Sequence, residues 1–170
     1  MAVEEQTTNN TDMLLATTWR KRIGQKLTIS DRTVTKLAFL LKKVGAVTGD
    51  LTYTIRKVSD DSIIVSKVWG DASALQTSLT WEEATFDAPT YVNEAVYIAA
   101  EFGELDGDKH IVFRYQNTNV KADELMAYYP SDSWTENATW DAAYRYTYGV
   151  VELENKSAGM AAKMLAGKMI

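Results

Sequence analysis

The amino-acid sequence predicts an all-β protein folded as a two-sheet jelly-roll sandwich. Trp and Tyr are frequent, with 5 and 9 copies among 170 residues, and many lie in or beside short runs that alternate apolar and polar side chains. Such alternation is typical of strands with one buried face. Turn residues recur about every eight to twelve positions, which is the strand spacing of sandwiches and jelly rolls.

The chain length is suited to one domain with attached terminal segments. Hydrophobic residues make up 46% of the sequence, which supports a packed core and argues against global disorder. We divide the chain into an N-terminal arm over 1–23, a β-sandwich over 24–150 and an amphipathic tail over 151–170. The first part of the arm is polar and rich in Thr and Asn, so it is either a flexible terminus or a segment ordered by a neighbouring subunit.

The expected strands in the first half of the sandwich cover residues 26–30, 34–44, 51–58 and 63–69. A turn at Asp31-Arg32 should separate the first two strands. The second strand is apolar on both faces, which is typical of a central strand. Alternation in the third strand assigns its side chains to two faces, with Leu51, Tyr53 and Ile55 inward and Thr52, Thr54 and Arg56 outward.

The expected strands in the second half cover residues 79–86, 96–102, 111–116 and 144–148, with a further short strand at 125–129. The remainder of 117–141 is expected to be loop. Pro89 should interrupt the strand pattern, because proline cannot donate a hydrogen bond to a neighbouring strand.

The C-terminal tail changes character and favours a short helix. Apolar residues recur at spacings of three and four, which places them on one helical face: Met160, Met164, Leu165 and Met169. A helix this short needs a surface to pack on. It either caps its own sandwich or inserts as an anchor into another subunit, since Met-rich faces adapt to partner surfaces.

Four segments carry a resemblance to a known type of domain: Gln25–Ile29, Val34–Gly45, Thr48–Arg56 and Trp81–Phe86. Together they resemble jelly-roll domains of the carbohydrate-binding-module type, including the choice-of-anchor domains. Those domains occur in secreted microbial proteins and in phage virion proteins. Because the shared motifs mark strands and turns, the resemblance implies the fold rather than a site. The polar N-terminus lacks the pattern of a secretory signal peptide, which favours a particle-borne role over a cell-surface role.

Residues for catalysis are scarce, and we expect the chain not to be an enzyme. His110 is the single histidine, cysteine is absent, and no G-x-S-x-G motif is present. A glycosidase needs two carboxylates that face one cleft. The adjacent Glu82 and Glu83 would point to opposite faces of a strand, and Asp60-Asp61 belongs to a turn.

An acidic loop suggests structural calcium, the only cofactor that we consider. Glu104, Asp106 and Asp108 lie close together in a segment that contains glycine. Calcium prefers clustered oxygen ligands of this kind, although the segment lacks the spacing of an EF-hand. The alternative is a solvated acidic hairpin.

Four aromatic residues gather in the region expected to be loop: Tyr128, Tyr129, Trp134 and Trp140. Three roles remain open for them. They could cover the end of the sheet as a lid, lie in a subunit interface where Trp and Tyr are enriched, or stack on sugar rings.

The net charge of −5 argues against nucleic acid as a partner. No segment approaches the roughly 18 apolar residues of a membrane-spanning helix, so a membrane is not expected as a partner either.

These observations favour a non-enzymatic structural protein of a virus or phage particle, either a capsid decoration protein or a component of a tail or fibre. It would be located in the virion and act through self-association and contacts with other virion proteins. One alternative is a carbohydrate-binding or adhesion module, extracellular or at a cell surface, whose loop aromatics hold glycans. Another is a subunit of an extracellular filament that exchanges a terminal strand with its neighbours.

Overall fold

The computed structural model describes residues 1–15, 20–103 and 108–150. Within these ranges the strands are β1 (Ala2–Gln6), β2 (Thr11–Leu15), β3 (Arg22–Val44), β4 (Asp50–Lys57), β5 (Ile63–Asp71), β6 (Thr80–Glu101), β7 (His110–Gln116), β8 (Leu125–Tyr129), β9 (Thr135–Asn137), β10 (Asp141–Ala142) and β11 (Tyr144–Val150). One 3-10 turn, η1 (Ala72–Ala74), follows β5. No helix in these ranges is long and apolar enough to cross a bilayer.

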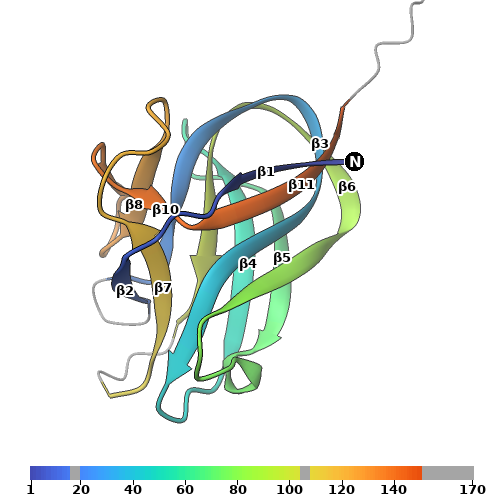
Figure 1. The fold of residues 1–170 in the computed structure, drawn as a ribbon. Helices are drawn as coiled ribbons and strands as arrows, with labels where there is room; N and C mark the ends of the chain where they lie inside the picture. Colours follow the sequence, from blue (N-terminus) through green and yellow to red (C-terminus); the bar gives the residue numbers. More distant parts are fainter. Residues whose placement is uncertain (16–19, 104–107, 151–170) are drawn as a thin grey trace, which may run out of the picture.

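The all-β prediction is confirmed, but the strands form one continuous antiparallel sheet where two were expected (Figure 1). The main path through this sheet is β1-β11-β3-β6-β4-β5, and the remaining strands pair with β3, β7 or β8. The long strands β3 and β6 run beside each other and bend together (Figure 1). Because each strand continues through the bend, the sheet folds over itself in a sandwich-like arrangement around one core. The tail at 151–170, expected to be helical, lies outside the described residues.

The first bend in β3 lies where the sequence predicted a turn. The pairing of β3 with β6 shifts register between Ile29 and Arg32, and Asp31 adopts a φ of 50°. Asp tolerates this left-handed conformation better than most residues do. The predicted turn is therefore a bulge inside one strand, because β6 follows β3 on both sides of it.

The interruption expected at Pro89 is a second bulge of the same kind. Thr85 pairs with Lys36 and Thr90 pairs with Val34, so the residues between Thr85 and Thr90 face an interval of only one residue on β3. Proline is tolerated at such a position because no ladder hydrogen bond requires its missing N–H. The segments predicted at 79–86 and 96–102 are thus parts of β6.

Aromatic side chains connect strands across the core. Phe39 of β3 contacts Tyr53 of β4 edge to face and Phe113 of β7 at a tilt, and both pairs of ring centroids are 5.1 Å apart. All three rings are fully buried. The Tyr53 hydroxyl donates a hydrogen bond of 3.0 Å to the backbone carbonyl oxygen of Glu82 in β6. Each buried ring contributes about 1.5–3 kcal/mol of hydrophobic stabilisation.

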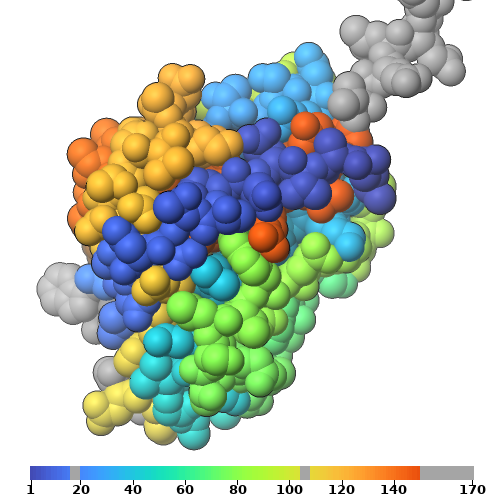
Figure 2. All heavy atoms as spheres, viewed as in Figure 1, coloured from blue at the N-terminus to red at the C-terminus, as the bar shows by residue number. Residues whose placement is uncertain are grey.

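The N-terminal arm predicted over 1–23 is not a free or partner-ordered segment in its described part. β1 pairs with β11 and β2 pairs with β7 of the same chain, and β3 already begins at residue 22. Figure 2 shows this segment lying across the surface of the molecule. The expectation is wrong because Met13 and Leu15 have places in this chain's own core. Ion pairs also hold β1 in place, with Glu4 contacting Arg32 and Lys121 and Glu5 contacting Arg145.

Replacement of Gly24 by Ala tests the close approach of β3 and β6. A Cβ at this position would lie 1.8 Å from the backbone oxygen of Ile98, so one strand must move away from the other. We expect Gly24→Ala to lower the free energy of unfolding by about 3 kcal/mol or more, measured by urea denaturation. Gly149→Ala on β11 is the matched control, because a Cβ there meets no atom within 4 Å. Equal effects of the two substitutions would contradict the close approach.

Candidate functional site

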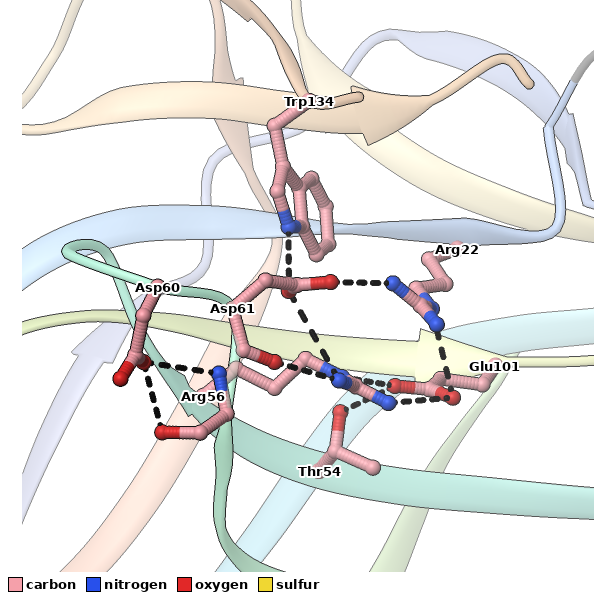
Figure 3. Close-up of polar contacts among 8 residues, drawn as sticks. Arg22, Thr54, Arg56, Asp60, Asp61, Glu101 and Trp134 are labelled. Atoms are coloured by element: carbon pink, nitrogen blue, oxygen red, sulfur yellow. Dashed lines mark hydrogen bonds and ion pairs between the residues drawn. The ribbon is translucent and has the colours of Figure 1, made fainter. Parts of the chain in front are cut away.

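A charged network lies on the face of β3, β6 and β4 that points away from the core (Figure 3). The pairing register places Arg22 of β3 opposite Glu101 of β6, and Glu101 opposite Thr52 of β4. Arg56 lies further along β4, and Asp61 belongs to the turn between β4 and β5. The antiparallel register therefore brings together charges that are far apart in the sequence.

Glu101 is the central acceptor of this network. Its Oε1 accepts hydrogen bonds from Arg56 Nε at 2.6 Å and from the Thr54 hydroxyl at 2.7 Å. Its Oε2 lies 3.5 Å from Arg22 Nε. The Arg56 side chain is only 9% exposed and that of Glu101 is 20% exposed, so water screens this pair weakly.

Asp61 completes the network from the turn. Its Oδ2 accepts from Arg22 Nη1 at 2.9 Å, its Oδ1 accepts from Trp134 Nε1 at 2.8 Å, and its backbone oxygen accepts from Arg56 Nη1 at 2.8 Å. Two carboxylates therefore balance two guanidinium groups. The turn itself is as predicted, since Asp60 Oδ1 accepts hydrogen bonds from the backbone N–H and the hydroxyl of Ser62.

The side chains of β4 that were predicted to point inward do so, but those predicted to point outward are not all exposed to solvent. Leu51, Tyr53 and Ile55 are fully buried. Thr54 and Arg56 are also buried, with 1% and 7% exposed, because the network uses their polar groups and covers them. Alternation identifies the face of a strand that a side chain occupies, but not what lies on that face.

Trp134 packs on the same face, in the loop between β8 and β9 (Figure 3). Its ring stacks on Tyr97 with centroids 4.3 Å apart, and it meets Tyr129 edge to face at 5.5 Å. The Arg22 guanidinium lies 4.3 Å from the Tyr129 ring centroid. Burial, followed by a hydrogen bond to Glu136, raises the pKa of the Tyr97 hydroxyl well above its usual value.

The two remaining aromatic candidates also pack on their own chain. Trp140 contacts Tyr115 of β7 with centroids 5.1 Å apart, and Tyr128 packs against the hydrophobic core. All four candidate rings are half-buried. Each of the four rings therefore contacts its own chain, and the lid, interface and sugar-stacking roles stay predictions.

A cavity of about 350 Å³ lies beside the charged network. It is lined by Lys21, Arg22, Asp50, Thr52, Thr54, Ile63, Ser66, Glu101, Phe102 and Gly103. Cations, carboxylates, hydroxyls and apolar groups therefore share one hollow on the outer face. Sequence reasoning did not identify this site, because no local motif marks residues that meet only through strand pairing.

The carboxylates considered for catalysis form hydrogen bonds and ion pairs with other residues of the chain. Glu82 accepts a hydrogen bond from the Thr80 hydroxyl at 2.6 Å, and Glu83 pairs with Lys36 at 2.8 Å. The His110 Nδ1 atom is buried and has no hydrogen-bond partner within the described part of the chain. The structure does not bring these groups together at one cleft.

The calcium and anchor candidates fall mostly beyond the described ranges. Glu104 and Asp106 lie outside them, whereas Asp108 lies just before β7. In the described ranges no three His, Asp or Glu side chains are grouped so that they could hold a metal ion. The anchor candidates are also outside the described residues, namely Met160, Met164, Leu165 and Met169.

A buried polar cluster fixes the segment that was expected to be loop. The fully buried Asp141 accepts hydrogen bonds from Gln25 Nε2 at 2.7 Å and from the backbone N–H groups of Val120 and Lys121. The Tyr144 hydroxyl donates to Glu124 at 2.7 Å. Burial raises the pKa of the Glu124 carboxyl above its usual value.

A scan against protein-family models matches no family, and a search of curated proteins finds no match.

Substitution of Glu101 tests whether the network stabilises the fold. Glu101→Gln leaves Arg22 and Arg56 facing one negative charge, so we expect the free energy of unfolding to fall by about 2 kcal/mol or more. The matched control is Glu83→Gln on the same strand, whose half-exposed ion pair should contribute less than about 1 kcal/mol. Urea denaturation measures both, and a Glu101→Gln effect no larger than that of the control would contradict this role.

The pH dependence of stability tests the burial of Glu124. Its pKa is higher in the folded than in the unfolded chain, so the folded state binds more protons between the two values. Stability therefore falls as pH rises through that interval, and the cost is absent at lower pH, where the carboxyl is protonated in both states. We expect Glu124→Gln to remove this fall in urea denaturation series from acidic to neutral pH.

Glu4→Gln is the control, because the contribution of Glu4 to stability depends on pH in the opposite direction. The hydrogen bond from Lys121 lowers the pKa of Glu4, so its stabilising contribution is present at neutral pH and is lost as pH falls through the lowered value. If both substitutions changed the pH dependence of the free energy of unfolding in the same direction, the proposed desolvation of Glu124 would be contradicted.

Proposed function

We propose that this chain is a non-enzymatic structural protein of a virus or phage particle, a capsid decoration protein or a tail or fibre component, that acts through subunit contacts. The supporting observation is the position of its exposed apolar side chains. Val3 of β1 is 55% exposed, and Ile63 and Val68 of β5 are 52% and 48% exposed. These strands form the two ends of the main sheet path, where another subunit can reach them.

The contact at β5 is proposed to use side chains rather than strand addition. The pairing of β5 with β4 has two register shifts, which disturb the outer row of backbone groups. Lys67 lies opposite the inward-facing Tyr53 and forms an ion pair with Asp87. An inward-pointing charge on an edge strand disfavours addition of a further strand.

The engagement of acidic side chains in contacts within the chain also supports a structural role. Glu101 and Asp61 balance arginines, Glu83 pairs with Lys36, and the half-buried Glu124 accepts a hydrogen bond from Tyr144. These groups stabilise the fold, and their contacts leave little capacity for chemistry on a substrate.

A particle-borne location is proposed from the resemblance to jelly-roll domains of phage virion proteins. We also propose that the fold is a variant of that jelly roll in which β3 and β6 each span both layers. Two of the resembling segments, Gln25–Ile29 and Val34–Gly45, fall in or at the end of β3.

The alternatives receive less support. A glycan-binding module would need aromatic faces open to a sugar, whereas the four loop aromatics are half-buried against their own chain. A filament that exchanges its N-terminal strand would need that strand to be available. β1 instead pairs with β11 of the same chain.

Sedimentation velocity tests the proposed subunit contact. We expect the full-length protein to self-associate with increasing concentration, and Ile63→Ser with Val68→Ser to shift it toward monomer, because burial of exposed apolar groups drives association. Val120→Ser is the matched control, since Val120 is equally exposed at 50% but lies on a loop. A wild-type protein that remains monomeric, or equal effects of the two changes, would contradict the contact.

A further inference from the structure

We propose that the cavity beside the charged network is a binding site for a small zwitterionic molecule of amino-acid or dipeptide size. This site goes beyond the structural role proposed above; it shares Ile63 with the proposed subunit contact, but its argument does not depend on that contact. Its volume of about 350 Å³ falls within the usual range of small-molecule pockets, about 300–1,000 Å³.

The cavity is formed by small residues on the outer face of the sheet. Thr52 and Thr54 of β4 and Ser66 of β5 are neighbours in the strand register, and none has a long side chain to fill the space above it. Gly103 follows β6, and a Cβ at this position would meet no atom within 4 Å. The hollow therefore results from a group of small side chains between longer ones.

Two oppositely charged residues line the cavity and have no side-chain partner among the described residues. The side chains of Lys21 and Asp50 are exposed and make no hydrogen bond or ion pair with other described residues. The nearby Arg22 and Glu101, by contrast, are engaged in the charged network. A lysine and an aspartate that line one hollow, without a side-chain partner in the described part of the chain, offer a positive charge to the carboxylate of a zwitterion and a negative charge to its ammonium.

The backbone holds these two residues in defined positions. The backbone N–H of Lys21 donates to the Tyr129 oxygen, and its carbonyl oxygen accepts from the N–H of Phe102. Asp50 begins β4 and pairs with Asp71 of β5. The charges are thus carried on fixed strand ends, although their side chains remain free to reach a ligand.

The remaining lining indicates an apolar group on the ligand. Ile63 lies at the rim with half of its surface exposed, and the Thr52 and Ser66 hydroxyls can bond the polar part of the molecule. Because exposed ion pairs contribute little each, we expect affinities of about millimolar strength.

Titration of the full-length, ¹⁵N-labelled protein with L-leucine and with L-leucylglycine tests the site by NMR. We expect saturable shifts at the amides that line the cavity. N-acetyl-L-leucine lacks the ammonium and L-leucinamide lacks the carboxylate, so each should bind about two- to fivefold more weakly than L-leucine.

Substitutions connect the binding to the cavity. Lys21→Met and Asp50→Asn should each weaken binding of L-leucine about two- to fivefold, and Gly103→Leu should abolish it by filling the hollow. Lys57→Met is the matched control on β4, because Lys57 pairs with Glu94 away from the cavity. The fold of each variant is checked by its own amide spectrum, and only folded variants are compared.

The proposal is overturned if neither L-leucine nor L-leucylglycine produces saturable shifts. It is also overturned if the singly charged analogues bind as well as L-leucine, or if Lys57→Met weakens binding as much as Lys21→Met.

Discussion

The pairing of β3 with β6 is the contact on which the rest of the structure depends. It extends over nearly the whole of both strands. β11 and β4 pair directly with one of the two, and β1 and β5 join the main sheet path through them. The bulges near Asp31 and Pro89 let the pair bend without ending. One ladder therefore supports the sheet on both sides of the bend and positions Arg22 against Glu101.

The same pairing explains why the outer face carries a polar network instead of open solvent. Side chains from β3, β6 and β4 meet there in register, and Trp134 covers them from the loop after β8. The network is balanced in charge, whereas Lys21 and Asp50, which line the adjoining cavity, have no side-chain partner within residues 1–15, 20–103 and 108–150. The stabilising network and the proposed binding cavity thus lie next to each other on one face of the sheet.

Much of the fold could be predicted from the sequence because alternation reports directly on strand faces. It assigned Leu51, Tyr53 and Ile55 to the core correctly. The sequence pattern wrongly predicted β3 and β6 as two strands each, because Asp31 and Pro89 are turn residues in most local contexts. Only the pairing with the partner strand shows that they lie in bulges. β1 was missed because a polar edge strand lacks a clear alternating pattern, and β2 because its apolar residues span only a few positions.

The site was less accessible to prediction. The aromatics near Trp134 could be identified by composition, but their contact with Tyr97 and Asp61 depends on tertiary packing. The cavity is lined by residues from four separate segments, and no motif connects them. Sequence spacing reports on neighbours along a strand and not on neighbours across the sheet.

Native-state hydrogen exchange tests the central role of the β3–β6 pair most directly. The account predicts that amides of β3 and β6 on both sides of the bend exchange last and with one common free energy, because a single cooperative unit links the layers. Amides of β1 and β2 that bond to β11 and β7 should also be protected. Separate exchange of the two halves of β3, or unprotected β1 and β2, would contradict the account.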